Sequence, residues 1–281
     1  MKKKVTTLLL YLLLLAGVGL LLYPTLANAW NERIYRHALV NYDNEVSNSG
    51  TDAIHDIWQK AIEYNERHAE QGNVFGHLTE EQKADYNEQL LLENGDVKDM
   101  IGYLEIPDYS IALPIYRGTS DEVLASGIGH LEGTSLPVGG AGSHCVVSGH
   151  TGFPSAKMLT DLEKARIGDL FCIKVLGERN VYEVDQIQVV LPDDFSNLQI
   201  SDGQDLCTIV TCTPYGINSH RLLVRGHRIT MEEAAPVLIV PEETSDNSLF
   251  IITVSVILLI LFLLTVFIVF IIRKNKKKCK K

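Results

Sequence analysis

Three side chains suited to thiol chemistry each lie at the edge of an apolar stretch of this 281-residue chain. Cys212 ends the run that begins at Leu206, His150 directly follows another apolar run, and Arg221 begins a third. A thiolate is the nucleophilic form of cysteine, and a neighbouring imidazolium lowers the thiol pKa from its ordinary value of about 8.5. A guanidinium adds fixed positive charge for a developing oxyanion. Together these residue types predict covalent acyl transfer by a cysteine.

Each of these residue types also has a structural explanation when it is taken alone. A cysteine in an apolar strand is commonly a small buried hydrophobe, which is our interpretation of Cys172 and our first interpretation of Cys207. A single histidine is commonly structural, and an arginine on a late strand commonly pairs with an acid. The coincidence of all three types in one chain favours the catalytic interpretation of His150, Cys212 and Arg221.

The elements that must position these residues are short β runs, which begin at Met100. Turn residues bound each run, as at Pro107-Asp108 and Asp202-Gly203. One helix is expected at 155–165. Many short strands with few helices are typical of a closed or nearly closed β-barrel, so the fold class is mainly β. The expected strands are 101–106, 110–116, 144–149, 170–176, 180–190, 205–212 and 221–229.

Residues 30–99 have a helical pattern instead. Ile54, Trp58 and Ile62 recur at intervals of four, with charged residues between them. The sequence Thr79-Glu80-Glu81-Gln82 is a capping box that introduces a second helix. A glycine-bounded loop, Gly72–Gly76, separates the two helices.

Both ends of the chain have the features of membrane segments. Residues 249–272 carry no charge and would form a helix of about 36 Å, which exceeds the roughly 30 Å core of a bilayer. A basic tail, 273–281, follows and marks the cytoplasmic side. The N-terminal segment, 1–29, combines three lysines with an apolar run and ends in Ala27-Asn28-Ala29, so a retained anchor and a cleaved signal are both open. Either alternative places residues 30–245 outside the cell.

Charge and cysteine content exclude two classes of protein. All 35 acidic residues, but only 15 of the 25 basic ones, lie between 24 and 248. A surface this acidic repels phosphate backbones, so we expect no nucleic-acid partner. Five cysteines, one of them Cys279 in the basic tail, are too few for a disulfide scaffold in an exported domain.

The order and spacing of the candidate residues resemble the active-site signature of the sortase family. Residues Thr208–Cys212 resemble the sortase pattern T-L-x-T-C, with Ile209 in place of the usual leucine, and Arg221 follows nine residues later. The resemblance spans about residues 100–230, and the two membrane segments are also similar to those of class C, the pilus-assembling sortases. Longer stretches that resemble this class are Ile106-Pro107, Leu113–Tyr116, Gly129–Pro137 and Cys212–Gly226.

The resemblance implies a division of the chain. A closed sortase-type β-barrel would occupy 100–235, and the N-terminal helices would lie within 30–99, with a lid-like loop at about 72–79. A linker at 236–248 would lead to the C-terminal membrane helix.

The resemblance also implies an activity, that of a cysteine transpeptidase cleaving an L-P-x-T-G-like sorting signal between Thr and Gly. Cys212 would attack the Thr carbonyl, His150 would protonate the leaving amine, and Arg221 would stabilise the oxyanion. The acyl group would pass to a lysine amine of another pilin subunit. This chemistry requires no metal and no organic cofactor, and the expected partners are pilin subunits and the lipid bilayer.

One feature of class C sortases is missing from this sequence. Their lid loop commonly contains Asp-Pro-Phe or Asp-Pro-Trp, and neither tripeptide occurs here. Asn73, Val74 and Phe75 occupy the corresponding position. We therefore expect a lid that is looser or differently anchored, with Phe75 either inserted near Cys212 or packed on the helices away from the catalytic residues.

Two further cysteines, Cys145 and Cys207, each precede a candidate catalytic residue by five positions. The family fold implies that their strands lie side by side and parallel, so that the two thiols face each other. Two alternatives stay open: a pair of buried free thiols, or a disulfide, because neighbouring strands are close enough for one.

The remaining histidines and arginines receive structural interpretations. His130 is expected to be structural, and His220 should face away from Arg221 because side chains alternate along a strand. Arg225 should share the face of Arg221, where it forms a salt bridge or, as a second possibility, acts as a further cation. Arg228 has no assigned role.

Other functions compatible with the sequence are a housekeeping sortase that attaches surface proteins to the cell wall, a thiol hydrolase, and a non-catalytic membrane-tethered assembly factor. The acceptor nucleophile separates the first two from a pilin polymerase, and the presence of all three candidate catalytic residues argues against the last.

Overall fold

The structure is a computed structural model, and it describes residues 2–76, 78–92, 99–153 and 155–234 together with positions 255 and 260. The chain divides into two compact units, residues 1–239 and 240–281. Apart from the two single positions, the predicted linker (236–248), C-terminal span (249–272) and basic tail (273–281) lie outside the described residues.

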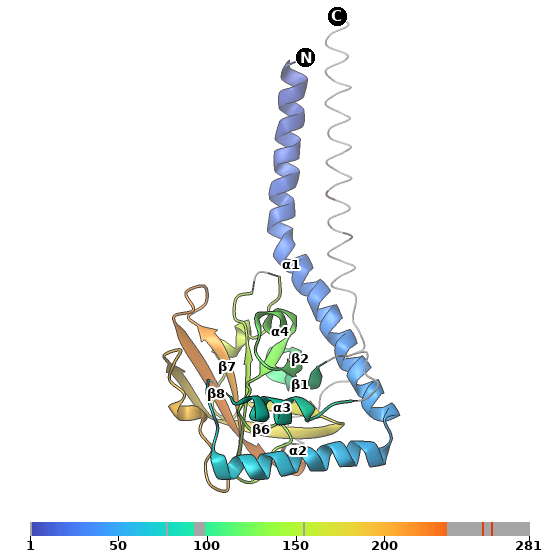
Figure 1. Ribbon diagram of the computed structural model, residues 1–281. Coiled ribbons are helices and arrows are strands. Elements are labelled where there is room, and N and C mark those ends of the chain that lie inside the picture. Colours follow the sequence, from blue (N-terminus) through green and yellow to red (C-terminus); the bar gives the residue numbers. More distant parts are fainter. Residues whose placement is uncertain are drawn as a thin grey trace, which may run out of the picture. The chain divides into compact units, whose positions relative to one another are not determined.

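The described part of the first unit is built around a closed barrel (Figure 1). The strand order is β1-β2-β3-β4-β7-β8-β6-β5, and neighbours are antiparallel except for β2/β3 and β4/β7. The fold is thus a closed β-barrel, as predicted. The strands are β1 (Met100–Ile106), β2 (Ile111–Arg117), β3 (Ile128–His130), β4 (Ser143–Gly149), β5 (Leu170–Val175), β6 (Glu178–Val190), β7 (Asp205–Thr213) and β8 (His220–Ile229).

The seven predicted strands are confirmed, each with its ends shifted by no more than two residues. The sequence did not predict β3, because three residues that include Gly129 are too short to show strand alternation. It also did not predict the short helix α4 (Asp121–Ser126), which begins after the N-cap Ser120.

The helix predicted at 155–165 is wrong. Only a 3-10 helix, η2 (Thr160–Lys164), forms in this segment. Met158 has a positive φ of 44°, and the Thr160 hydroxyl donates to the carbonyl of Lys157 at 2.5 Å. These local bonds close a tight turn where an α-helix would have to continue. Two further 3-10 helices are η1 (Pro107–Tyr109) and η3 (Ser196–Leu198).

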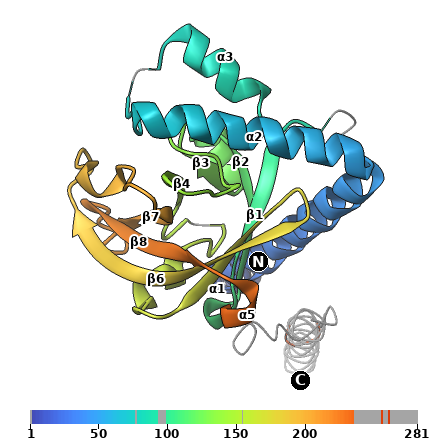
Figure 2. The same ribbon diagram turned by 90° about the horizontal axis from the view of Figure 1, so that it is seen from below.

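The predicted N-terminal helices are confirmed as α2 (Thr51–Gln71) and α3 (Glu80–Glu88). The capping box at Thr79 and Gln82 is present: each side chain accepts a hydrogen bond from the backbone N–H of the other residue, at 3.2 and 2.9 Å. A much longer helix, α1 (Lys2–Asn48), precedes them, and the short α5 (Met231–Ala234) follows the barrel. Figure 2 shows α2 crossing the barrel, with α3 on its outer side.

Alternation along the strands gives the barrel two apolar layers. Cys145 and Val147 of β4 point into the core, as do Ile209 of β7 and Val224 of β8. Residues of the opposite parity form a second cluster, called here the outer cluster, on the outside of the barrel. Its buried members are Val146, Leu198 and Leu223, with Phe75, Leu131, Val190 and Val210 packed against them.

The N-terminal helix is long and apolar enough to cross a membrane. Among the described residues it is the one helix that meets this criterion; within its segment Tyr11–Asn48, the most apolar stretch of 18 residues has a mean hydropathy of 1.8, and none of that stretch is buried in the protein. Leu13, Leu20 and Leu21 are each at least 74% exposed. Leucines arranged along one exposed helix in this way are typical of contact with lipid.

Candidate active site

The parallel pairing of β4 with β7 brings His150 and Cys212 to the same end of the barrel. Gly149 is the register partner of Thr211, so the next residue on each chain is one of the two candidates. Adjacent strands lie about 4.8 Å apart. His150 and Cys212, 62 residues apart in the sequence, therefore lie side by side at two carboxyl-terminal strand ends.

On the other side of the thiol, Cys212 is the direct cross-strand partner of Arg221. Cβ atoms of opposed residues in antiparallel strands lie about 4.5–5.5 Å apart. Cys212 shares the outer face of β7 with Val210, and Arg221 shares the outer face of β8 with Leu223. The thiol thus lies between the histidine and the arginine, and all three residues are half-buried.

Two threonines fix the segment that carries His150. The Thr211 hydroxyl donates to the carbonyl of Gly149 at 2.8 Å and lies 2.6 Å from the hydroxyl of Thr151. Both threonines are buried. The His150 ring stacks on Phe153, with ring centroids 5.1 Å apart and planes inclined by 3°. The sequence assigned no role to Thr151, Thr211 or Phe153, although Thr211 belongs to the motif before Cys212.

Arg221 keeps its charge available. Its Nη1 donates only to backbone carbonyls, those of His220 (3.1 Å) and Asn218 (3.4 Å), and no carboxylate of the described residues forms an ion pair with it. Arg225, on the same face, instead holds Asp185 through two bonds of 2.9 and 3.1 Å. This confirms the salt bridge expected for Arg225 and removes it as a second free cation.

Asp185 was not predicted as the partner of Arg225. It lies where the register of β6 against β8 shifts between Val184 and Gln186, and a bulge of this kind turns a side chain out of regular alternation. Nη1 of Arg228 lies 3.9 Å from Oδ2 of Asp205, and the guanidinium lies over the ring of Tyr182. Arg228 therefore has the contacts of a structural residue.

A groove of about 210 Å³ extends from Arg221 over the outer face of the barrel. Most of its lining is apolar, with Ser148, Thr119 and Asp194 as polar members. Such a groove suits the aliphatic side chains of an extended peptide whose carbonyl lies near the thiol. Its other lining residues are Leu124, Leu131, Val190, Pro192, Phe195, Leu198, Val210 and Leu223.

The lid-like loop after α2 is anchored through Asn73. Its amide nitrogen donates to the carbonyls of His144 (3.1 Å) and Leu198 (2.6 Å), and its Oδ1 accepts from Nε2 of His68 (3.0 Å). Asn73 is only 7% exposed. A neutral amide therefore anchors the loop, by contacts to β4, to η3 and to α2.

Val74 continues this attachment. Its N–H donates to the carbonyl of Gly133 at 2.8 Å, and a Cβ on Gly133 would lie 2.2 Å from the Val74 oxygen. Gly133 also has φ +82°, in the region that glycine alone adopts readily. The loop can thus approach the barrel this closely only because residue 133 is glycine.

Phe75 packs on the barrel and not on the helices. Its ring stacks on Phe195, with centroids 4.9 Å apart and planes inclined by 9°. Phe75 belongs to the outer cluster. Two other members of that cluster, Leu198 and Val210, also line the groove. Phe75 therefore lies beside the groove, because its stacking partner Phe195 lines it. Val210 lies two residues before Cys212, but Cys212 itself is not a member of the outer cluster. His77 of the predicted lid lies outside the described residues.

Cys145 and Cys207 are direct register partners across β4 and β7. Both are buried and both are free thiols. The two cysteines lie side by side on parallel strands, as expected. Of the two alternatives, a disulfide or a pair of buried free thiols, the structure has the free thiols. Burial raises the pKa of Cys207 well above its ordinary value. Cys172 is buried as predicted, and burial raises its pKa to about 11.

The other histidines have structural surroundings. His130 is fully buried; its Nε2 donates to the carbonyl of Ser135 at 2.9 Å and its Nδ1 accepts from the hydroxyl of Tyr86 at 3.0 Å. This agrees with the structural role expected for His130. His220 contacts the hydroxyl of the neighbouring Ser219 at 2.9 Å.

His144 is a buried histidine that the sequence did not single out. Its Nδ1 donates to the carbonyl of Gln199 and its Nε2 accepts from the hydroxyl of Thr208, both at 2.8 Å. Burial lowers its pKa to about 4. The ring is therefore neutral, and it joins β4 to β7 and to the segment after η3.

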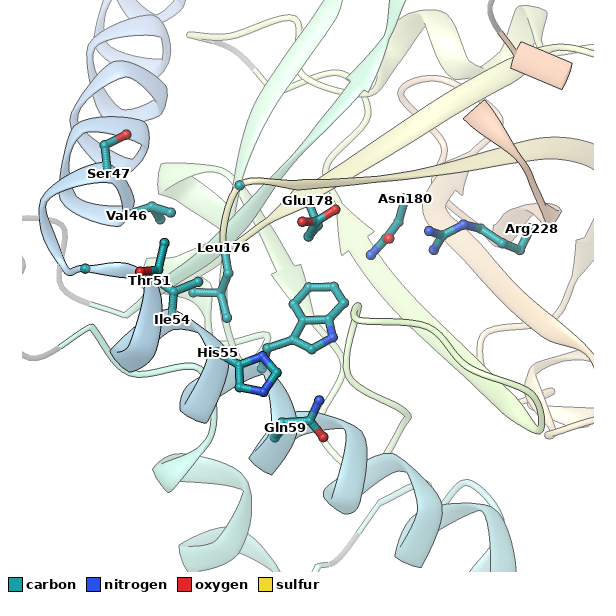
Figure 3. A pocket seen from close by; sticks show the side chains of 13 residues that line it. Val46, Ser47, Thr51, Ile54, His55, Gln59, Leu176, Glu178, Asn180 and Arg228 are labelled. Atoms are coloured by element: carbon teal, nitrogen blue, oxygen red, sulfur yellow. The ribbon is translucent and has the colours of Figure 1, made fainter. Parts of the chain in front are cut away.

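A larger cavity, of about 720 Å³, lies away from these residues (Figure 3). Its lining comes from the corner between α1 and α2, the β5–β6 turn and Arg228 of β8. Figure 3 shows Glu178 and Asn180 on one side and His55 on the other. It contains no cysteine, so it offers no thiol nucleophile. In the described part of the chain no cluster of three or more His, Cys, Asp or Glu side chains has the arrangement of a metal site.

Known proteins share this architecture. A model of the sortase domain matches residues 104–229. The solved structure of sortase C1 from Streptococcus agalactiae is 45% identical and superposes with a TM-score of 0.66, covering 69% of this chain and 98% of its own. Sortase C from Streptococcus pneumoniae is 39% identical with a TM-score of 0.61, covering 69% and 97%.

A curated relative, sortase A of Bacillus anthracis, is 27% identical over 131 residues. That match covers 47% of this chain and 60% of the relative, so the chain spans less than two thirds of this relative's length.

Proposed function

The chain belongs to the sortase family of cysteine transpeptidases, and from this premise we propose that it is a class C sortase that joins pilin subunits covalently. One observation carries the proposal: His150, Cys212 and Arg221 meet at one end of the barrel beside an apolar groove. The lid-like loop that packs along this groove through Phe75 supports the assignment to class C.

In the first half-reaction the Cys212 thiolate attacks the carbonyl carbon of Thr in an L-P-x-T-G-like signal. A C–S bond forms, and the charge that develops on the carbonyl oxygen is stabilised by Arg221, whose guanidinium has no carboxylate partner among the described residues. The Thr–Gly C–N bond then breaks. His150 donates its proton to the departing glycine amine, which leaves a thioester on Cys212.

In the second half-reaction a lysine amine of another pilin attacks the thioester. Neutral His150 accepts a proton from this amine, the C–S bond breaks, and Cys212 leaves as the thiolate. The products are an isopeptide bond and the enzyme in its starting protonation state. Thr151 and Thr211 keep His150 at this position by fixing the backbone before and after it.

Pilins are the proposed substrates because of the class C relatives. The Streptococcus pneumoniae sortase C is described with pilin substrate specificity, and its structure covers 69% of this chain. The acidic extracellular segment and the two apolar ends fit a membrane-anchored enzyme. We place α1 across the membrane with the N-terminus in the cytoplasm, residues 249–272 as a second span, and the barrel outside the cell.

The test uses the full chain in detergent, incubated with an L-P-x-T-G peptide, and records intact protein mass. The expected result is an added mass equal to the peptide up to Thr on the unaltered protein and none on Cys212→Ala. A protein that binds the peptide without this adduct, even after deletion of residues 70–78, would be a non-catalytic assembly factor.

The acceptor is tested by adding a lysine-containing pilin fragment, an oligoglycine that represents a cell-wall amine, or no amine. Transfer to the lysine supports pilin joining. Preferred transfer to oligoglycine would identify a housekeeping sortase, and equal rates of thioester loss with and without amines would identify a hydrolase.

A further inference from the structure

Two asparagines join α1 to the segment that follows His150. The Asn28 Oδ1 accepts a hydrogen bond from the backbone N–H of Lys157 at 2.7 Å, and the Asn31 Nδ2 donates to the carbonyl of Ser155 at 2.7 Å. These contacts connect positions 129 and 124 residues apart. We call Asn28 and Asn31 the asparagine clasp.

The clasp lies just beyond the apolar part of α1, which ends at Tyr23. At about 1.5 Å per helical residue, Asn28 and Asn31 follow Tyr23 by roughly 8 and 12 Å along the axis. The headgroup layer of each leaflet is about 5–8 Å thick, from a 40–45 Å bilayer with a core near 30 Å. The clasp therefore holds the segment after His150 at the outer edge of the headgroup layer.

The loop between β7 and β8 lies beside the same segment. A Cβ on Gly152 would lie 3.0 Å from the ring of Tyr215, so the Tyr215 side chain packs directly against the backbone of Gly152. Tyr215 is 61% exposed and Ile217 is 71% exposed. Cys212 immediately precedes this loop. We call Gly152, Ser155, Lys157, Tyr215 and Ile217 the mouth of the barrel.

Side chains on α1 at this level have the character of an interface. Trp30 is 62% exposed and lies between the two asparagines of the clasp. Tryptophan is enriched where a helix leaves the bilayer. The exposed Tyr215 and Ile217 add apolar contact at the same end.

We propose that the mouth of the barrel rests on the headgroup layer of the membrane that α1 crosses, held there by the asparagine clasp. The proposal rests on the membrane anchoring given under the proposed function. A peptide substrate then reaches Cys212 along the bilayer surface, while the loop before β7, at Asp202, faces the aqueous side. β7 has nine residues, and at about 3.3 Å per residue its two ends are roughly 30 Å apart.

The proposal is tested by fluorescence quenching of single tryptophans in the full chain. Trp30→Phe and Trp58→Phe remove the native indoles, and Ile217→Trp or Asp202→Trp places one at the mouth or at the opposite end. Each protein is reconstituted into phosphatidylcholine–phosphatidylglycerol vesicles that contain a phospholipid spin-labelled on its headgroup. We expect loss of most of the fluorescence at position 217 and no loss above background at position 202.

The clasp is tested in the Ile217→Trp protein by adding Asn28→Ala and Asn31→Ala together. We expect the quenching at 217 to fall to the level at 202. The matched control is Asn41→Ala, because Asn41 lies on the same helix and its side chain, among the described residues, bonds to His37 of that helix. It should leave the quenching at 217 unchanged.

Membrane anchoring of α1 is measured separately, as the quenching of Trp30 in the Trp58→Phe protein, where Trp30 is the one remaining tryptophan. If Trp30 is quenched but positions 217 and 202 are equally unquenched, α1 is anchored and the proposal about the mouth is overturned. Quenching at 217 that the clasp substitution leaves intact would overturn the role of the clasp. If Trp30 itself is unquenched, the anchoring in the proposed function fails and the proposal fails with it.

Discussion

Cys212 and Arg221 are direct partners across β7 and β8, at the one end of the barrel where His150 also emerges. The arginine has two backbone carbonyls as partners and no carboxylate within the described chain. Arg225, which follows Leu223 on the same strand face, is instead neutralised by Asp185. Of these two arginines on one face, Arg225 is held in an ion pair and Arg221 is not, as the proposed catalytic role of Arg221 requires.

Arg221→Ala should lower kcat for transfer to an amine by about 10²–10³-fold, the usual effect of removing an oxyanion-stabilising donor. Arg225→Ala is the matched control. It should leave kcat within a few-fold of the unaltered enzyme and lower the free energy of unfolding by about 1 kcal/mol, because it breaks a partly exposed ion pair. Transfer kinetics and denaturant unfolding measure both effects. Equal losses of kcat would contradict the assignment.

Asn73→Ala should release the lid-like loop. The substitution removes two hydrogen bonds to the carbonyls of His144 and Leu198. At about 1 kcal/mol for each bond the loss is about 2 kcal/mol, so the loop should leave the groove roughly thirtyfold more often. We expect faster acylation of Cys212 by an L-P-x-T-G peptide, measured as the rate of adduct formation. The control is Asn197→Ala, because Asn197 is half-buried and its side-chain amide, within the described residues, donates to the hydroxyl of Ser196.

Phe75→Ala should increase the same acylation rate, because it removes the ring that stacks on Phe195 beside the groove. An acylation rate that neither substitution changes would mean that the loop does not restrict the groove.

Buried His144 should make stability depend on pH. Its pKa falls from the ordinary 6.5 to about 4 in the folded chain, so between these values the unfolded chain binds more protons. The contribution of His144 is complete above about pH 6.5, decreases as the pH falls towards 4, and changes no further below that. The total loss should be about 3 kcal/mol.

Chemical denaturation at several pH values between 4 and 7 measures this loss. His144→Gln should flatten the dependence. It should not abolish it, because burial also lowers the pKa of His68. The exposed His55 serves as the control position, and His55→Gln should leave the slope as it is. A slope that His144→Gln does not alter would show that another group is responsible.

The thiols should differ sharply in reactivity. Cys145, Cys172 and Cys207 are buried, and Cys212 is half-buried at the open strand end. We expect iodoacetamide to modify Cys212 but not these three in the folded protein, and peptide mass mapping measures this. Denatured, unreduced protein should present all five thiols of the chain. Loss of two titratable thiols would instead establish a Cys145–Cys207 disulfide.

Much of the fold and the candidate site could be predicted because it depends on local pattern. Strand alternation and turn residues located seven strands, and the capping box at Thr79 and Gln82 depends on residues three apart. The motif around Cys212 placed the thiol at a strand end, and parity along β8 placed Arg225 beside Arg221. The helix at 155–165 was wrong because helical pattern competes there with side-chain-to-backbone bonds that close a turn.

Contacts between distant segments were decided by the tertiary structure alone. Asn73 and His144 are 71 residues apart, and Asn28 meets Lys157 across 129; no local periodicity records either contact. The sequence by itself determined which residues could do the chemistry, because apolar runs and turns specify strand ends. The parallel register of β4 against β7 brings His150 and Cys212 together. The family resemblance implied this register, but no local pattern of residues encodes it, because strand pairing depends on how the whole barrel closes.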